Sequence, residues 1–201
     1  MILGTDARFG CLDGVVRTRV GYCGGTTPAP TYRRLGNHSE TVEVDYAPLA
    51  ITYRDLLAVF FASHTPTHPP FSKQYRSAIF YRTEEERLAA EEAIAGAEAT
   101  VGRVCVAVEP FHAFHPAEDY HQKYTLRRYR EVTGEFRRML SRERDFVDST
   151  AVARVNGWLS GCATAEQLDL ELPLTGLSSK SQDTVRAAAM PGGRARIGCS
   201  A

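Results

Sequence analysis

The chain has 201 residues, of which 43% are hydrophobic, and its 24 basic and 24 acidic residues give a formal net charge of zero. This length and composition are typical of one globular domain with an appendage and exclude wholesale disorder. The balanced charge gives no reason to expect nucleic acid or an acidic membrane surface as a partner. No apolar run approaches the roughly 20 residues that span a bilayer, and residues 1–10 lack the pattern of a secretory signal.

Alternating and continuous apolar residues predict four strands in the first 110 residues, and apolar stripes at helical spacing predict two helices. The predicted strands are residues 15–22, 41–46, 75–81 and 104–108, and the predicted helices are residues 53–64 and 83–99. Residues 23–32 between the first two strands are rich in glycine and proline and form a loop. Thr83 with Glu86 three residues later makes a capping box at the second helix. This order of elements favours an α+β sandwich with helices packed on a mixed or antiparallel sheet.

After about residue 130 the pattern becomes helical. Helices are predicted at residues 131–140, 149–159, 164–172 and 178–190. A boundary near residue 145 then divides the chain into a body of residues 1–145, a helical extension of residues 146–190 and a tail of residues 191–201. Val152, Val155 and Leu159 fall on one helical face, so we expect that face to pack against the body.

Five cysteines occur at wide spacing, which argues against both a disulfide framework and a zinc knuckle. They are Cys11, Cys23, Cys105, Cys162 and Cys199. A reducing, cytoplasmic compartment is the expectation, with an organelle address encoded ahead of Met1 as the alternative.

Four short motifs follow one another along the body. They are YxGGxxPxPTY at residues 22–32, HxE at residues 38–40, QYRSAI at residues 74–79 and AEDYHQ at residues 117–122. Each motif is weak alone, but in this order and spacing the chain closely resembles the A-type peptide methionine sulfoxide reductases. The resemblance implies a ferredoxin-like α/β sandwich that reduces methionine S-sulfoxide, free or in proteins, with thioredoxin or another dithiol as reductant. It implies no cofactor and no metal, and we expect a monomer.

The resemblance assigns a role to three side chains around the sulfoxide oxygen. Glu40 is the acid that protonates the oxygen, and Tyr32 and Tyr75 hydrogen-bond it. His38 is expected to support its loop. Taken without the motifs, Glu40 reads as a solvated carboxylate at a strand end, and the two tyrosines read as aromatics covering the core.

The nucleophile of the family is missing at its expected position. In the family a cysteine lies in Gly-Cys-Phe-Trp-Gly, five residues before the acidic residue of the first helix. Counting back from Asp6, Gly4 keeps the second glycine, Ile2 and Leu3 replace the aromatic pair, and the nucleophile position falls on Met1. A thioether has no proton to lose and cannot act as a thiolate. Reduction by this chain is therefore expected to be impaired, and the alternative is an inactive module that keeps the sulfoxide pocket.

The other cysteines and histidines leave further alternatives open. Cys11, Cys23 and Cys105 are expected to be small buried hydrophobic residues, whereas Cys162 and Cys199 are candidate resolving cysteines. A third hypothesis is a metal protein, because Glu118-x-x-His121 has the helical spacing of a carboxylate–histidine pair. Structural hydrogen bonding is the favoured use of that pair.

Overall fold

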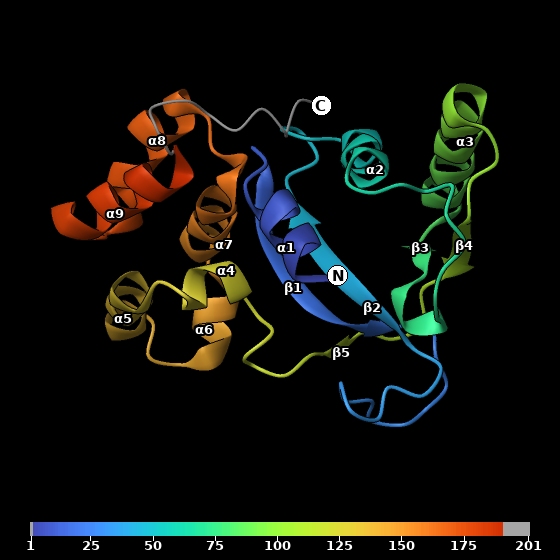
Figure 1. The fold of residues 1–201 in the computed structure, drawn as a ribbon, viewed down its shortest axis with the longest axis horizontal. Coiled ribbons are helices and arrows are strands. Elements are labelled where there is room, and N and C mark those ends of the chain that lie inside the picture. The colour runs from blue at the N-terminus through green and yellow to red at the C-terminus, as the bar shows by residue number, and fades with distance from the viewer. Residues whose placement is uncertain (1, 191–201) are drawn as a thin grey trace.

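The computed structural model describes residues 2–190, with side chains from Gly4 onward. Its strands form two separate sheets (Figure 1). In the first sheet, β1 (Val15–Cys23) pairs antiparallel with β2 (Ser39–Tyr46) and with the short β5 (His115–Pro116). In the second, β3 (Ser77–Tyr81) pairs parallel with β4 (Val106–Pro110). The α+β class expected from the sequence is confirmed.

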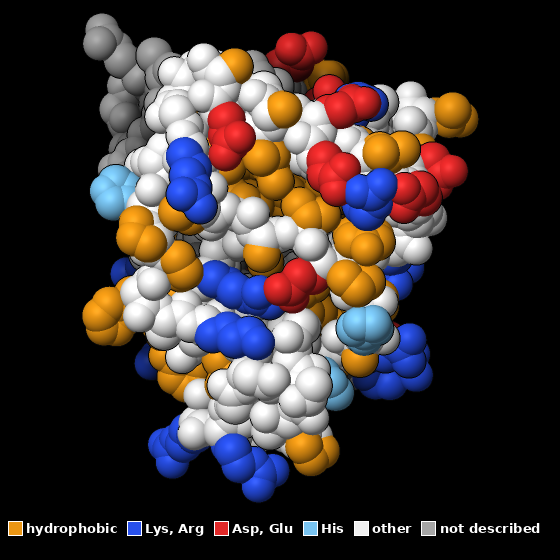
Figure 2. All heavy atoms as spheres, turned by 90° about the vertical axis from the view of Figure 1, so that its right-hand side faces the viewer, with side chains coloured by type: hydrophobic (Ala, Val, Ile, Leu, Met, Phe, Trp, Pro, Cys, Tyr) orange, Lys and Arg blue, Asp and Glu red, His pale blue; other side chains and the backbone are white. Residues whose placement is uncertain are grey.

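Three helices cover these strands. Helix α1 (Ile2–Gly10) packs against β1 and β2, and α2 (Tyr53–Ala62) packs against α3 (Glu84–Val101). Thr83 caps α3, since its hydroxyl accepts a hydrogen bond from the backbone N–H of Glu86. The reciprocal half of the predicted capping box is replaced, because the Glu86 carboxylate accepts from the backbone N–H of Arg82 at 2.6 Å. On the side of the molecule that carries α3, β3 and β4, hydrophobic side chains gather near the centre with charged side chains around them (Figure 2).

The C-terminal helices lie on the opposite side of β1 and β2 from β3 and β4 (Figure 1). They are α4 (Tyr124–Arg127), α5 (Arg130–Met139), α6 (Glu143–Asp148), α7 (Thr150–Gly157), α8 (Ala165–Glu171) and α9 (Ser179–Ala189). Their apolar side chains form one large cluster around the fully buried Trp158, Phe136 and Phe146. Helix α7 contacts α1 and β1. Val152, Val155 and Leu159 are buried, but they pack mainly within the apolar cluster of the C-terminal helices, and the contacts with α1 come from Ala153, Asn156 and Gly157 instead.

Some boundaries and short elements differ from the prediction. Residues 73–75 form a single 3-10 turn, so β3 starts at Ser77, two residues later than predicted. Strand β4 starts at Val106, so Cys105 precedes it and is only half-buried. Among residues 2–190 no helix is long and apolar enough to cross a membrane.

A buried ion pair joins the body to the C-terminal helices. The Lys123 ammonium, with no exposed surface, donates to the Asp6 carboxylate at 3.0 Å and to the Thr18 carbonyl at 2.5 Å and hydroxyl at 2.6 Å. Asn156 of α7 donates to the other oxygen of Asp6 at 3.1 Å. Burial lowers the pKa of Lys123, and Asp6 opposes that effect. All three protons of the ammonium thus have acceptors, which a buried charge requires.

Replacing Lys123 with methionine should destabilise the protein by about 3–5 kcal/mol, because the Asp6 carboxylate would stay buried without its cation. Urea denaturation followed by circular dichroism measures the change. The matched control is Arg142→Met, which removes an ion pair with Asp145 at the surface and should leave the midpoint almost unchanged. Equal midpoints for the Lys123 variant and the unaltered protein would contradict the conclusion that this ion pair stabilises the contact between the body and the C-terminal helices.

Candidate active site

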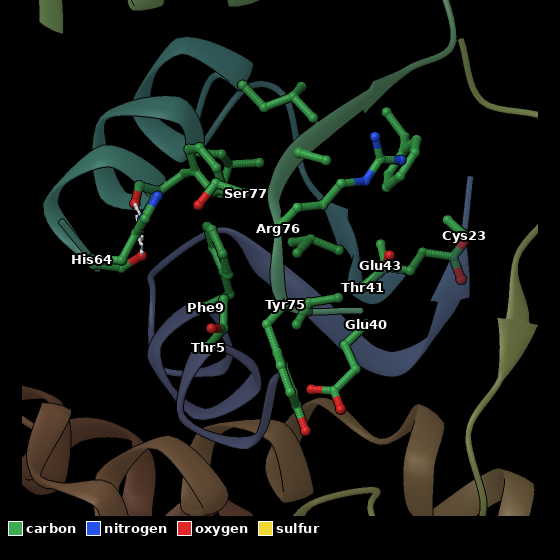
Figure 3. Close-up of a pocket in the computed structure, with 18 of the residues that line it drawn as sticks. Thr5, Phe9, Cys23, Glu40, Thr41, Glu43, His64, Tyr75, Arg76 and Ser77 are labelled. Carbon is green, nitrogen blue, oxygen red and sulfur yellow. Dashed lines mark hydrogen bonds between the residues drawn. The ribbon is translucent and has the colours of Figure 1, made fainter. Parts of the chain in front are cut away.

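A groove of about 940 Å³ opens between the two sheets. Its walls come from α1, β2, α2 and the segment that leads from the 3-10 turn Lys73–Tyr75 into β3. Tyr32, Glu40 and Tyr75 all line it. Figure 3 shows the Tyr75 hydroxyl and the Glu40 carboxylate directed toward the same spot. The structure therefore brings together the three side chains that the motifs singled out.

Glu40 is positioned by the register of the first sheet. It lies opposite Tyr22 in the antiparallel pairing of β1 and β2, so both side chains are on the same face of the sheet. The side-chain amide of Gln74 donates a hydrogen bond to Glu40 Oε1 at 2.8 Å. Gln74 directly precedes Tyr75, so this bond ties the carboxylate to the turn that carries the phenol.

The turn that carries Tyr75 is anchored by its neighbour Arg76. The Arg76 guanidinium pairs with Glu109 of β4 through both terminal nitrogens, and its Nε donates to the Ser39 hydroxyl at 2.7 Å. Ser39 in turn donates to the carbonyl of Lys73 at 3.0 Å. The Tyr75 ring itself stays 46% exposed, as a side chain that meets a ligand must. A hydrogen bond with Tyr32 is the main cause that raises the pKa of Tyr75, and burial and the Glu40 carboxylate add to it.

Glu118 holds the backbone of Tyr32 in place. Its Oε1 accepts the Tyr32 N–H at 3.0 Å, and its Oε2 accepts the Tyr22 hydroxyl at 2.8 Å. Burial alone would raise the pKa of Glu118. The two hydrogen bonds described above, a further one from its own backbone N–H and the nearby His121 together outweigh burial, so the pKa of Glu118 is lowered. The Tyr32 ring packs against the His121 ring with centroids 4.9 Å apart. Glu118 and His121 thus build the wall behind Tyr32.

Gln74 and Glu118 are the site residues that sequence reasoning missed. Both lie inside the quoted motifs, and that position was the signal available. The spacing of Glu118 and His121 had also raised the metal hypothesis. Residues 2–190 contain no group of three or more histidine, cysteine, aspartate or glutamate side chains arranged to hold a metal ion.

His38 supports its loop, as expected. Its Nε2 lies 2.9 Å from the Thr27 carbonyl, and its ring is buried against Gly25, where a Cβ would come within 2.4 Å of the ring. His115 packs edge-on against it with centroids 5.2 Å apart. Gly25 is therefore required by the close approach of this ring.

Cys23 lines the same groove but lies on the opposite face of the β1–β2 pair from Glu40. It follows Tyr22 in β1, so its side chain points to the other face of the sheet, beside Thr41 and Glu43 and away from the Glu40 carboxylate (Figure 3). Burial raises the pKa of Cys23 to about 11, and Glu43 adds to the shift, although Thr41 and Arg82 oppose it. The thiol is therefore protonated near neutral pH.

The remaining cysteines lie elsewhere. Cys11 is 2% exposed and contacts α7 at Gly157, consistent with a small buried hydrophobic residue. Cys162 is half-buried, packs against the large apolar cluster and ends the π-helical turn Trp158–Cys162. Met1 and Cys199 lie outside the described residues, so the nucleophile position and one of the two candidate resolving cysteines have no structural account.

Comparison with known proteins identifies the class. The model of the family described as peptide methionine sulfoxide reductase matches residues 2–151. A peptide methionine sulfoxide reductase of Drosophila melanogaster is 33% identical over 179 residues, covering 87% of this chain and 71% of the relative. Peptide methionine sulfoxide reductase A5 of Oryza sativa is 45% identical over 133 residues, covering 62% of this chain and 52%, about half, of the relative.

Solved structures agree with the sequence matches. Methionine sulfoxide reductase A of Corynebacterium diphtheriae superposes with a TM-score of 0.58 at 33% identity, covering 63% of this chain and 70% of that one. Mxr1 of Saccharomyces cerevisiae gives 0.59 at 26% identity, covering 62% and 79%. Fold and matches together define an oxidoreductase of the methionine sulfoxide-reducing class. The chain belongs to the peptide methionine sulfoxide reductase family and is of its A type, the peptide-methionine (S)-S-oxide reductases, which confirms the fold implied by the motifs.

Iodoacetamide should alkylate Cys23 in the folded protein about two orders of magnitude more slowly at pH 7.5 than a thiol with an ordinary pKa of about 8.5, because so little thiolate is present. Peptide mass spectrometry of samples quenched over time measures the rate, with the urea-unfolded chain as reference. A Cys23→Ser variant identifies the peptide. Equal rates in the folded and unfolded chains would show that Cys23 is an accessible, activated thiol.

Proposed function

We propose that this chain binds methionine S-sulfoxide, free or in proteins, at the end of the groove formed by Tyr32, Glu40 and Tyr75. We further propose that reduction there needs a thiolate that Met1 does not supply. The observation that supports the proposal is the meeting of one carboxyl group and two phenols, drawn from three separate segments, at one place in the groove.

The chemistry of sulfoxide reduction accounts for these residue types. A thiolate attacks the sulfur, the S–O bond breaks, and the oxygen passes to the thiol as a sulfenic acid while the substrate leaves as the thioether. Glu40 supplies the proton that the oxygen needs, and the hydroxyls of Tyr32 and Tyr75 stabilise the charge that develops on it. A second thiol, for which Cys162 and Cys199 are the candidates, then forms a disulfide with release of water, and a thioredoxin-type dithiol reduces that disulfide.

The chain as it stands should bind the S-epimer of N-acetylmethionine sulfoxide more tightly than the R-epimer, without dithiothreitol-dependent turnover. Isothermal titration measures binding, and chromatography of the thioether product measures turnover. Glu40→Ala should weaken binding roughly fivefold, the loss expected when one hydrogen bond of about 1 kcal/mol is removed. Glu85→Ala, on the exposed first turn of α3, is the matched control. Equal affinity for both epimers would refute the proposed site, and turnover by the unaltered chain would refute the proposed need for a thiolate at residue 1.

Restoring the family motif should restore catalysis. The rebuilt protein carries Met1→Cys, Ile2→Phe and Leu3→Trp, and it should reduce the S-sulfoxide with dithiothreitol. In this background Glu40→Ala should lower kcat about 100-fold or more, as expected for loss of a positioned general acid. Unchanged thermal unfolding of the Glu40 variant excludes a folding defect. A near-unaltered rate after loss of Glu40 would remove the residue from its role.

A further inference from the structure

The two segments that bring the phenols to the proposed site also carry cations beside them. Arg33 and Arg34 directly follow Tyr32. Lys73 opens the 3-10 turn that ends at Tyr75. The three cationic side chains are exposed, as are both phenols. Two positive charges on one segment and one on the other therefore flank the mouth of the site.

A tight turn holds the two arginines next to the phenol of Tyr32. Backbone hydrogen bonds join Thr31 and Arg34 in both directions, at 3.0 and 3.3 Å, and the Thr31 hydroxyl accepts a further one from the Arg34 N–H at 3.2 Å. Tyr32 and Arg33 lie between them, so they occupy the tip of the turn. Because Glu118 anchors the Tyr32 N–H, the turn keeps both arginines beside a phenol of fixed backbone position.

The three cations have no carboxylate partner of their own. In the described part of the chain Arg33, Arg34 and Lys73 form no ion pair, whereas the neighbouring Arg76 pairs with Glu109. Hydrogen bonds from Arg76 are the main cause that lowers the pKa of Glu109, and the charge of Lys73 adds to it from a greater distance. An exposed cation without an internal partner is free to pair with a carboxylate of a ligand.

The acidic groups of the site leave this positive charge in excess. Glu118 accepts two hydrogen bonds, and Glu40 accepts one from Gln74. Asp119 is exposed on the segment behind Tyr32, one carboxylate against three cations. Figure 2 shows Lys and Arg side chains in the lower part of its face, at the level of the loop between β1 and β2, and Asp and Glu side chains gathered in the upper part with α3.

A protein substrate must bring its own chain past these charges. When its sulfoxide lies against Glu40, the residues one or two positions away lie roughly 3–7 Å from it along an extended backbone. They then come within the reach of the side chains of Arg33 and Lys73. Aspartate and glutamate match these groups, since a guanidinium binds a carboxylate through paired hydrogen bonds and an ammonium attracts it as a point charge.

We propose that the mouth of the site selects methionine S-sulfoxide that is flanked by aspartate or glutamate, and that Arg33, Arg34 and Lys73 recognise those carboxylates. The inference rests on the proposed function, because it takes the sulfoxide to lie among Tyr32, Glu40 and Tyr75. It adds the charge of the neighbouring residues as the property that decides which oxidised protein segments bind.

Calorimetric titration of the chain as it stands with three peptides tests the proposal. Each peptide has methionine S-sulfoxide in the centre, with two aspartates, two serines or two lysines on either side. At about 50 mM salt the aspartate peptide should bind about tenfold more tightly than the serine peptide, from the sum of several modest surface pairs, and the lysine peptide should bind most weakly. At about 500 mM salt the difference should fall to about twofold, because salt screens exposed charges.

Charge reversal identifies the residues responsible. The double variant Arg33→Glu with Arg34→Glu should invert the order, so that the lysine peptide binds most tightly. The matched control is Arg128→Glu with Arg130→Glu, two exposed arginines at α4 and α5 on the other side of β1 and β2 (Figure 1), and it should keep the original order.

The outcomes separate this inference from the proposed function. If N-acetylmethionine S-sulfoxide binds and the three peptides bind alike, the selection by charge is refuted and the proposed function stands. If neither the free sulfoxide nor any peptide binds, the proposed function fails and this inference fails with it. If the unoxidised aspartate peptide binds as tightly as its sulfoxide form, the cations attract anions without regard to the site, which also overturns the inference.

Discussion

The buried pair of Lys123 and Asp6 holds α1, β1 and α7 together behind the candidate site. Asp6 belongs to α1, Thr18 to β1, and Asn156, which completes the carboxylate, to α7. Lys123 itself has a left-handed backbone, with φ of 53°, a conformation that a residue with a Cβ adopts only at some cost. The preceding residue, Gln122, pairs its side-chain amide with both backbone groups of Val20, at 3.0 Å and 2.8 Å, as a neighbouring strand would. The segment is therefore fixed along β1.

Fixing that segment also fixes the wall of the site. Glu118 and His121 lie a few residues before Lys123. Because residues 118–123 are fixed along β1, Glu118 contacts Tyr22 and Tyr32, and His121 packs on Tyr32. A buried ion pair gains little net stability over well-packed apolar residues, but its strict hydrogen-bond geometry tolerates one arrangement. In this protein the pair fixes α1, β1 and the segment before Lys123 relative to one another. The phenol of Tyr32, which packs on that segment, is held in place as a result.

The local pattern of apolar residues predicted most of the helices and strands, whereas the site depends on contacts between segments that lie far apart in the chain. The strands around Val20 and Val42 and the helix around Leu57 were visible because alternation and helical spacing record which side faces the core. Helices α4 and α6 have four and six residues, too short for a periodic stripe to emerge. Alternation along β2 shows that one face is buried but not which edge is paired, so the split between the two sheets was invisible. The role of Glu118 was hidden for the same reason, because Tyr22, its partner, lies 96 residues away in the chain.

The two faces of the β1–β2 pair carry different side chains, and this difference explains why the thiol of Cys23 is separated from the site and keeps its proton. The face of Tyr22 and Glu40 carries the site, whereas the face of Cys23 carries the charges of Arg19, Glu43 and Asp148. A thiol there is buried next to a carboxylate, and both effects hold its proton.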